Sequence, residues 1–376
     1  MKILAINPGS TSTKIAVFDN DKPIMRHTIR HSVEELSRFK RVIYQMEYRR
    51  ELVLKALADN NISLDFDAVI GRGGLTEPIP GGVYEVNEEM VKALYSCPRD
   101  HACNLGSLIA RDIASLIPGA RAFMADPGIV DEMDEVCHIS GSPHLPRITT
   151  WHALNQRAIG RRFAADYSAT HPDAPKKYEE MDLIIAHLGG GISVGAHHLG
   201  RCVDVNNAFD GEGPFSPERA GTLPSGALID LCFSGKYTKD QLKRRISGKA
   251  GLAAHLGTID VQEVERRIAH GDEHARLVLD AMIYQIAKSI GALTPVLRGH
   301  VDAILLTGGI AHSEYVMERL VDRVSFIAPV HIYPGEDELE AMALNALGAL
   351  HGELPVQEYR RPQVVADVSV AGGLAK

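Results

Sequence analysis

One pattern of strand, turn and strand occurs twice in this sequence, half a chain apart. Residues 3–18 hold an apolar run, a polar turn with a glycine and a second apolar run, which together predict a β-hairpin. Residues 182–196 repeat this layout at a constant offset of 180. Two copies of one hairpin predict a duplicated domain, with domains 1–180 and 181–376 and the two turns facing each other across a central cleft. Coincidence between two unrelated hairpins is the alternative.

Both turns carry groups that suit an anion. The offset matches Asn7 with His187 and Thr13 with Ser193. Backbone N–H groups, hydroxyls, an amide and a lysine can surround a negatively charged ligand, and phosphate is the obvious candidate. The predicted phosphate-binding residues are Asn7, Ser10, Thr11, Ser12 and Lys14 in the first turn, and His187, Gly189, Gly190 and Gly191 in the second. Ordinary hairpins without a ligand are the alternative interpretation.

The composition fits a folded chain of about two domains. The 376 residues are 45% apolar and 23% charged, and the formal net charge of −8 argues against an electrostatically driven nucleic-acid partner. No segment approaches the roughly 20 apolar residues of a membrane span, and the first residues do not resemble a signal peptide. The five scattered cysteines indicate reduced thiols rather than a disulfide framework. We therefore expect a cytoplasmic protein that contacts neither nucleic acid nor membrane.

Strands and helices are expected to alternate in both halves, as in α/β proteins. Three further strands end in turns where such proteins bind ligands, at the carboxyl ends of the strands. These strands are 66–70 before the glycine-rich turn 71–74, 121–125 before Asp126, and 301–306 before 307–309. Apolar residues at helical spacing predict helices over 33–60, with a solvated basic face, over 273–293 and over 337–350. No element is expected from Val364 onward.

Two common nucleotide-binding motifs are absent. A Walker loop needs a second glycine and then Lys-Ser or Lys-Thr, whereas in the first turn Lys14 follows a threonine. Neither turn opens a helix with the glycine spacing of a Rossmann motif. The remaining interpretation is a β-hairpin phosphate grip, in which the chain resembles the actin, Hsp70 and sugar-kinase superfamily along its whole length. This resemblance implies two duplicated actin-like (ribonuclease H-like) α/β domains, with an adenosine-side turn that includes Gly308 and Gly309.

Six short motifs narrow the resemblance to the acetokinase family, and within it to the butyrate kinase branch. They are Asn-Pro-Gly-Ser-Thr-Ser-Thr-Lys at 7–14, Gly-Arg-Gly-Gly-Leu at 71–75, Pro-Ile-Pro-Gly-Gly at 78–82, His-Ala-Leu-Asn at 152–155, His-Leu-Gly-Gly-Gly at 187–191 and Pro-Gly-Glu-Asp-Glu at 334–338. The resemblance implies reversible, Mg²⁺-dependent phosphoryl transfer between ATP and a short-chain carboxylate such as butyrate. It also implies a homodimer or a larger homo-oligomer.

Three other activities remain open. A kinase for branched acids such as isobutyrate is hard to separate from a butyrate kinase, because one methyl group is worth only about 1–3 kcal/mol of discrimination. An acetate kinase fits less well, since acetate kinases carry Gly-Thr-Arg-Ser-Gly where this chain has Gly-Thr-Leu-Pro-Ser-Gly at 221–226. An actin- or Hsp70-like ATPase that acts on a protein partner belongs to a different class, and the short chain argues against it.

The implied reaction brings two anions together, the carboxylate and the γ-phosphoryl group. A carboxylate is already ionised and needs no general base, so the site must supply positive charge and alignment. Arg72 suits this role because its guanidinium binds oxygens in a bidentate manner and its flanking glycines let a ligand approach closely. An exposed loop arginine is the alternative for Arg72. We expect Arg219 to supply the charge of the family arginine that 221–226 lacks.

The resemblance also singles out residues that their spacing would not. It places Asp126 and His152 as catalytic residues beside the transferring phosphoryl group, and Glu338 with Asn7 as the groups that order Mg²⁺. Without the resemblance, Asp126 would be interpreted as a turn residue and His152 as a packing residue at a helix start. Glu336 and Asp337 are one-residue alternatives to Glu338.

An apolar acyl pocket has two candidate residues. Leu75 and Trp151 lie next to Arg72 and His152 in the sequence. Plain core packing is an equally good interpretation of both. The resemblance implies that the first domain holds the phosphate turn and the acyl substrate and the second domain the adenosine, with the last helix able to pack back on the first domain.

Overall fold

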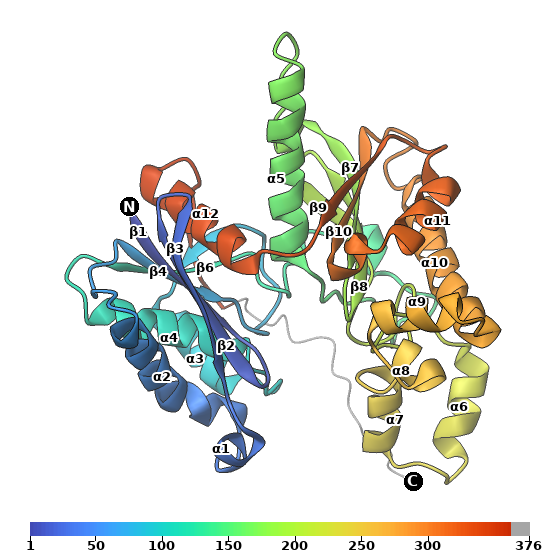
Figure 1. Ribbon diagram of the computed structural model, residues 1–376, viewed down its shortest axis with the longest axis horizontal. Helices are drawn as coiled ribbons and strands as arrows, with labels where there is room; N and C mark the ends of the chain where they lie inside the picture. Colours follow the sequence, from blue (N-terminus) through green and yellow to red (C-terminus); the bar gives the residue numbers. More distant parts are fainter. Residues whose placement is uncertain (362–376) are drawn as a thin grey trace. The chain divides into compact units, whose positions relative to one another are not determined.

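The computed structural model describes residues 1–361, which form two compact units with one sheet each (Figure 1). Unit 1 contains 1–131, 138–147 and the described residues from 337 onward, and unit 2 contains 132–137 and 148–336. No helix within 1–361 is long and apolar enough to cross a membrane. The expectation for Val364 onward lies outside the described residues.

Unit 1 is built on a seven-stranded mixed sheet. Its strands are β1 (Lys2–Pro8), β2 (Ser12–Asp19), β3 (Lys22–Arg30), β4 (Ala68–Arg72), β5 (Val83–Glu85), β6 (Arg121–Ala125) and β12 (Val356–Glu358), in the spatial order β12-β5-β6-β4-β1-β2-β3. Its helices are α1 (Val33–Ser37), the 3-10 helix η1 (Val42–Gln45), α2 (Met46–Asp59), α3 (Glu88–Ser96), α4 (Asn104–Ser115) and α12 (Glu338–His351). The short 3-10 helix η2 (Glu135–His138) spans the change of unit at 137–138.

The sheet of unit 1 is covered on both faces. Side chains of a strand alternate between faces, and in β1 Leu4 and Ile6 join a core cluster with residues of α2 and α4. Ile3 and Ala5 are fully buried on the opposite face, where α12 packs against β1 and β4. Figure 1 shows α2 and α4 on one side of this sheet and α12 on the other. The last helix therefore packs back on the first sheet.

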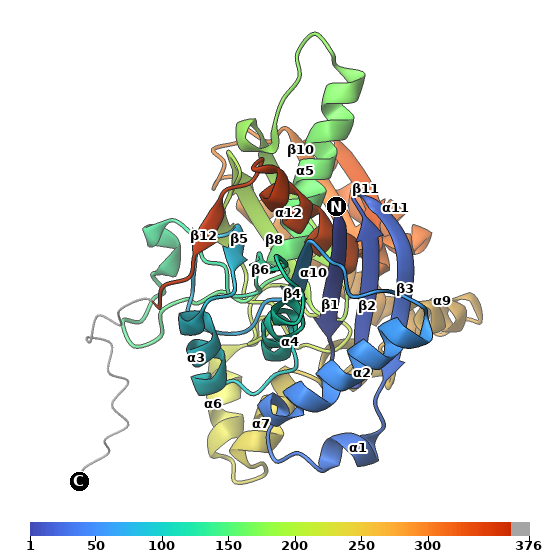
Figure 2. The ribbon, with the colours of Figure 1, turned by 90° about the vertical axis from the view of Figure 1, so that its left-hand side faces the viewer.

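Unit 2 is built on a five-stranded sheet in the order β11-β10-β7-β8-β9. Figure 2 faces the other sheet, that of unit 1, whose strands follow one another from β12 to β3 across the view. The strands of unit 2 are β7 (Asp182–Leu188), β8 (Ile192–His198), β9 (Arg201–Val205), β10 (Ala303–Gly308) and β11 (Val330–Pro334). Its helices are α5 (Ala153–Thr170), η3 (Tyr178–Glu180), α6 (Ser225–Phe233), α7 (Lys239–Ile246), α8 (Gly251–Leu256), α9 (Val261–Ala269), α10 (Glu273–Leu293), η4 (Gly309–His312) and α11 (Glu314–Val324).

The central strand of unit 2 is apolar on both faces because helices cover both. Leu183 and Ile185 of β7 belong to a core cluster with Phe163 of α5. Ile184 and Ala186 belong to the large cluster that includes the buried stripe of α10. Contacts therefore assign 148–180, with α5, to unit 2, whereas the sequence repeat sets its boundary at residue 180.

The two sheets share one topology. In both, three antiparallel strands (β1-β2-β3 and β7-β8-β9) are followed, beside the first of them, by two parallel strands (β4, β6 and β10, β11). The duplication expected from the repeated hairpin is present. The match of Thr13 with Ser193 is wrong, because Asn7 pairs with Lys14 whereas His187 pairs with Ser193. The second turn is one residue shorter, so Ser193 corresponds to Lys14.

The expected helix over 33–60 is broken into α1, η1 and α2. Its basic face is not entirely solvated, because Arg49 is fully buried together with Val53 and Leu57. These three residues follow one another at intervals of four, so an arginine occupies the stripe of α2 that faces the core. The expectation of a solvated basic face is therefore wrong at Arg49.

Candidate active site

Three predicted site residues lie at the carboxyl edge of the first sheet. In the parallel strands β1, β4 and β6, Ile6 pairs with Gly71 and Gly71 with Met124. The next residue of β1 is Asn7 and the next of β4 is Arg72, while Asp126 follows the last residue of β6. Ligands of α/β proteins bind at such an edge. The strand register thus brings together residues from three separate motifs.

Glu338 joins Arg72 and Asn7 in one polar cluster. Its Oε1 forms an ion pair with Nη1 of Arg72, and its Oε2 accepts a hydrogen bond from Nδ2 of Asn7 at 2.5 Å. The side chains of Arg72 and Glu338 are only 16% and 20% exposed. The cluster places a fork of positive charge beside a carboxylate and an amide.

The neighbouring acidic residues have other roles. Asp337 precedes α12, where it accepts a hydrogen bond from the N–H of Glu340 at 2.9 Å and pairs with Arg26 at 2.6 Å. A helix N-terminus favours such a carboxylate. Glu336 belongs to unit 2, where its Oε2 lies 3.1 Å from Nε2 of His187. Glu338 is the acidic candidate that contacts both Arg72 and Asn7.

Asp126 fixes the loop of the 78–82 motif. Its Oδ1 accepts a hydrogen bond from the N–H of Gly82 at 2.7 Å, and its own N–H donates to the carbonyl of Gly82 at 3.0 Å. Asp126 is fully buried and has φ of +39°, which is strained for a residue with a side chain. Strain of this kind is often kept at functional sites, and here it turns the carboxylate toward the loop.

The first turn is held from behind by a residue that the sequence interpretation missed. Ser10 and Thr11 are exposed at the turn, and Lys14 is exposed on β2. Arg49 donates to the carbonyl oxygens of Gly9, Ser10 and Ser12. The signal that could have identified Arg49 is its position on the apolar stripe of α2, where an arginine needs many hydrogen-bond acceptors.

In unit 2, the two histidines that were predicted as site residues lie face to face. The rings of His152 and His187 are 3.8 Å apart between centroids and inclined by 14°. Nδ1 of His152 lies 2.9 Å from Oγ of Ser193, and Nδ1 of His187 lies 2.7 Å from Oδ1 of Asn155. His187 is only 1% exposed. Asn155 belongs to the 152–155 motif and Ser193 to the repeated hairpin. Both residues could therefore have been identified from the sequence motifs.

The glycine turns of unit 2 line one cavity of about 740 Å³. Gly189, Gly190 and Gly309 contribute to it, together with Glu218 and the first residues of α9 and α11. Gly308 has φ of +93°, and a Cβ there would lie 2.4 Å from the carbonyl oxygen of Leu188. Only glycine lets these two turns approach so closely. His187 does not line the cavity but lies behind the turn.

Arg219 lies against the second turn. A Cβ on Gly191 would come within 2.2 Å of its Nη1, which donates to the carbonyl of Ala208 at 2.5 Å. The guanidinium also stacks over the ring of Phe209 at 5.0 Å. Burial lowers the pKa of Arg219, although Glu218 and Asp210 partly offset this. Arg219, which we expect to supply the charge of the missing family arginine, is thus fixed beside the second predicted phosphate turn.

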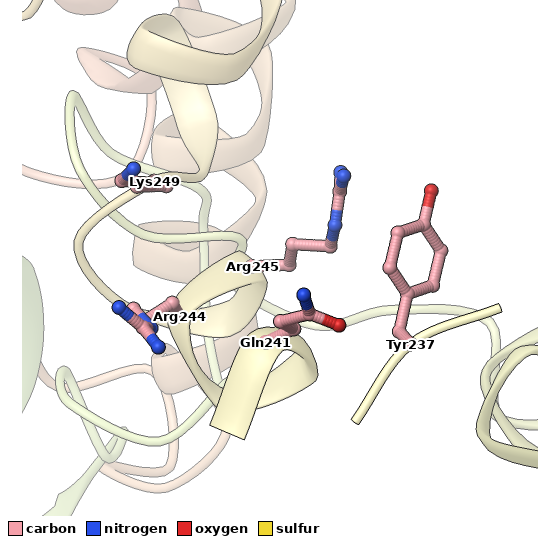
Figure 3. Close-up of a pocket in the computed structure, with 5 residues that line it drawn as sticks. All are labelled: Tyr237, Gln241, Arg244, Arg245 and Lys249. Atoms are coloured by element: carbon pink, nitrogen blue, oxygen red, sulfur yellow. The ribbon is translucent and has the colours of Figure 1, made fainter. Parts of the chain in front are cut away.

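The end of α7 is tied to the Arg219 segment. Arg219 forms a β-bridge with Ser247, and the N–H of Ala220 donates to the carbonyl of Ile246 at 2.9 Å. Beside α7 lies a hollow of about 360 Å³, shown in Figure 3, where Arg245 extends alongside Tyr237 while Arg244 and Lys249 lie on the other side of the helix. None of the predicted site residues lines this hollow.

The two candidates for the acyl pocket are packed within their own units. Leu75 packs against the core of unit 1, and its N–H donates to Oδ1 of Asn104 at 2.8 Å. Trp151, in unit 2, is 3% exposed, and its ring and that of His197 are T-shaped with 5.8 Å between their centroids. Their role in substrate binding remains a prediction.

Acid is expected to destabilise the fold through His197. This histidine is fully buried between the hydroxyl of Tyr178 and Oε1 of Gln156, and burial lowers its pKa from 6.5 to about 3. The unfolded chain protonates this histidine below about pH 6.5, whereas the native state does so only near pH 3. The contribution of the neutral histidine to the free energy of unfolding is therefore complete above pH 6.5 and is lost as the pH falls from 6.5 toward 3.

Thermal melting between pH 7.5 and 4.5 measures this effect. His197→Gln should melt at a lower temperature at pH 7.5 and show a smaller decline with acid than the parent protein. His300→Gln, which changes an exposed histidine of the same unit, should leave the decline unchanged. If the melting temperature of His197→Gln fell with acid as much as that of the parent protein, the destabilisation would belong to other groups.

Within residues 1–361 no group of three or more His, Cys, Asp or Glu side chains is placed to hold a metal ion. Glu338 nevertheless offers one carboxylate, and Oδ1 of Asn7 accepts no hydrogen bond from a described residue. Magnesium bound to a nucleotide usually takes one or two protein oxygens and completes its shell with water and phosphate. The pair fits an ion of that kind and would not hold one alone.

Comparison with known proteins agrees with the motifs. The model of the acetokinase family matches residues 161–333. A Bacteroides thetaiotaomicron protein named probable butyrate kinase is 61% identical over 360 residues, which cover 96% of this chain and all of that protein. Butyrate kinase 2 of Clostridium acetobutylicum is 49% identical over 361 residues, which cover 96% of this chain and 99% of its own.

Among solved structures, the crystal structure of Porphyromonas gingivalis acetate kinase matches with a TM-score of 0.74 at 20% identity, covering 93% of this chain and 99% of that one. At this identity the likeness shows the fold alone. The expected fold of two duplicated actin-like α/β domains is confirmed. Because relatives of high identity extend over nearly the whole length, the chain belongs to the acetokinase family.

Proposed function

We propose that this protein transfers the γ-phosphoryl group of ATP to butyrate, forming butyryl phosphate and ADP, and that it runs the reaction in both directions. The observation that carries the proposal is the cluster of Asn7, Arg72 and Glu338, which three distant motifs of the chain contribute. The names of the relatives at 61% and 49% identity support butyrate as the acid.

The chemistry requires charge and alignment rather than a base. One carboxylate oxygen of butyrate attacks the γ-phosphorus, an O–P bond forms, and the bond from phosphorus to the β,γ-bridging oxygen breaks as ADP leaves. No proton moves, since the nucleophile is already ionised. Arg72 is proposed to bind the acid or the transferring oxygens with its fork and so to reduce the repulsion between two anions. His152 and Asp126 are proposed to stand beside the transferring group.

Magnesium is proposed as the metal of the reaction. Glu338 and Asn7 would hold it together with water and the phosphate oxygens of the nucleotide. When bound, the ion neutralises phosphate charge and orients the γ-phosphoryl group. The contact of Arg72 with Glu338 fixes the position of that carboxylate.

The cavity of 740 Å³ in unit 2 is proposed to take the adenosine of ATP. It is lined by the turn at Gly309 and by the turn that contains Gly189 and Gly190. Backbone N–H groups of glycine turns can reach phosphate oxygens closely, because no side chain intervenes. We also propose a homodimer or larger homo-oligomer, which light scattering of the purified protein would measure.

The direct test is a substrate series. The protein is incubated with ATP, Mg²⁺, hydroxylamine and one acid at a time, from acetate to hexanoate and including isobutyrate, and the trapped hydroxamate is measured. We expect the highest kcat/KM with butyrate. Isobutyrate at the top of the series would make the protein a branched-acid kinase, and ATP hydrolysis without hydroxamate from any acid would refute the proposal.

Arg219→Ala is expected to lower turnover about 100-fold, the loss seen when one donor to a transferring group is removed. Arg244→Ala is the matched control, because Arg244 is an exposed arginine of the adjoining helix. Turnover of both variants is measured with saturating ATP and butyrate. Near-normal turnover of Arg219→Ala would remove this residue from the catalytic set.

A further inference from the structure

Arg49 is a buried cation without a carboxylate partner. It is 0% exposed, and every one of its hydrogen bonds goes to a neutral acceptor. Nη1 donates to the carbonyl of Gly9 at 2.7 Å, and Nη2 donates to Oε1 of Gln45 at 2.8 Å. Throughout the described chain, residues 1–361, Arg49 forms no ion pair.

Such a charge is costly to bury. Burial lowers the pKa of Arg49 to about 10, so the guanidinium is still charged at neutral pH. The adjacent buried histidine adds no second charge, because burial and the nearby Arg49 lower the pKa of His31 to about 4. A single positive charge therefore stays inside unit 1, directly behind the turn at 7–14, where its hydrogen bonds alone do not neutralise it.

The contacts of Arg49 also decide which way the turn faces. The carbonyl oxygens of Gly9, Ser10 and Ser12 point inward and accept from Arg49, and that of Thr11 accepts from the N–H of His31 at 2.9 Å. The N–H of Gly9 closes the turn on the carbonyl of Ser12 at 2.7 Å. All four carbonyls of the turn are thus drawn to the protein side.

The outer face of the turn is left with donors. Ser10 and Thr11 are exposed, and their N–H groups bond to no other residue within 1–361. An outward face of N–H and hydroxyl groups, with a positive charge behind it and no carbonyl oxygen pointing outward, is suited to an anion.

We propose that Arg49 is a positioning residue of the phosphate turn and that its missing counter-ion is the phosphoryl group bound on the outer face. Arg49 touches neither nucleotide nor acid. It acts through the turn, by fixing the direction of the carbonyls and by adding positive potential from behind. The inference rests on the proposed function in one respect, namely that the anion is the phosphoryl group that ATP and butyryl phosphate share and ADP lacks.

Gln45→Glu tests the charge without removing Arg49. The substitution keeps the size of Gln45 and its acceptor oxygen Oε1 but gives the guanidinium a counter-ion inside the protein. We expect the melting temperature to stay the same or rise while the Kd for ATP increases at least tenfold and the Kd for ADP changes less than threefold, both by calorimetry. The control is Asn61→Asp, which makes the same amide-to-carboxylate change at an exposed position just after α2.

Arg49→Gln and Arg49→Lys test the other half of the inference. Arg49→Gln should raise the KM for ATP and for butyryl phosphate at least tenfold and leave the KM for butyrate within about twofold, and Arg49→Lys should recover part of the loss because it keeps the charge. Arg50→Gln removes the next guanidinium of the same helix, which pairs with Asp112 at 2.6 Å, and should change none of these values.

Equal weakening of ATP and ADP binding in Gln45→Glu, or unchanged ATP binding, would overturn the inference. The Gln45→Glu result decides even if the Arg49 variants do not fold. Calorimetry with ATP also separates this inference from the proposed function: a protein that makes no hydroxamate with any acid can still lose ATP affinity in Gln45→Glu.

Discussion

Arg72→Ala should lower the rate of butyryl hydroxamate formation by about a thousandfold, the upper range for removing one preorganised donor from a transferring group. Arg72 forms the cluster with Asn7 and Glu338, and it stands at the carboxyl end of β4. Its loss would leave two anions to meet without the guanidinium that we propose to reduce their repulsion. The measurement is kcat and the KM for butyrate at saturating ATP and Mg²⁺.

Arg72→Lys should restore only a small part of the rate, because a lysine keeps the charge but loses the bidentate geometry. The matched control is Arg111→Ala, which breaks an exposed ion pair with Glu88 in the same unit and should leave kcat within about twofold, as expected for a surface pair. A loss in Arg72→Ala of less than tenfold, with the fold intact by circular dichroism, would show that the charge comes from elsewhere.

The second large effect is expected at Glu338. Glu338→Gln should lower kcat about 100-fold and raise the Mg²⁺ concentration for half-maximal activity about tenfold or more, in line with the losses seen when groups around a metal are altered. The physical reason is the loss of the carboxylate that we propose as a protein oxygen donor to the ion. The measurement is a Mg²⁺ titration of hydroxamate formation at fixed ATP.

Two acidic neighbours of Glu338 serve as controls. Glu340→Gln changes an exposed carboxylate two residues further along α12 and should leave the Mg²⁺ titration unchanged. Asp337→Asn should lower the melting temperature rather than the metal affinity, because Asp337 caps α12 and pairs with Arg26. A Mg²⁺ shift in Asp337→Asn but not in Glu338→Gln would move the proposed metal ligand by one residue.

The layered fold was predictable because its signal is local. The repeated hairpin appears in residues 3–18 and 182–196 as an alternation of apolar and polar runs, and strand patterns of this kind depend on near neighbours. The length of the second turn was not predictable in the same way. His187 and Ser193 are paired because three residues close the turn, whereas four residues close the first turn between Pro8 and Thr13.

The candidate site shows the same division. Motifs singled out Asn7, Arg72 and Glu338 separately, but their contacts depend on α12 packing across β1 and β4, which no local pattern encodes. Arg49 was missed for the opposite reason, because its local position could be read from the sequence but its contacts could not. It was visible on the apolar stripe of α2, but an arginine among lysines and arginines was interpreted as part of a solvated face, and only the inward carbonyls of the first turn explain its burial.

The return of residues 337–361 to unit 1 has a consequence for how the chain is made. The ribosome completes the first 131 residues long before it synthesises α12 and β12, so until then the nascent first unit lacks the helix that covers Ile3 and Ala5 and the carboxylate that meets Arg72. Unit 2 is finished first in sequence. Its completion therefore does not have to wait for the last residues, whereas the first unit remains incomplete until residues 337–361 have been synthesised. A chain that stops at residue 336 would contain every residue of the first turn and still have no assembled site.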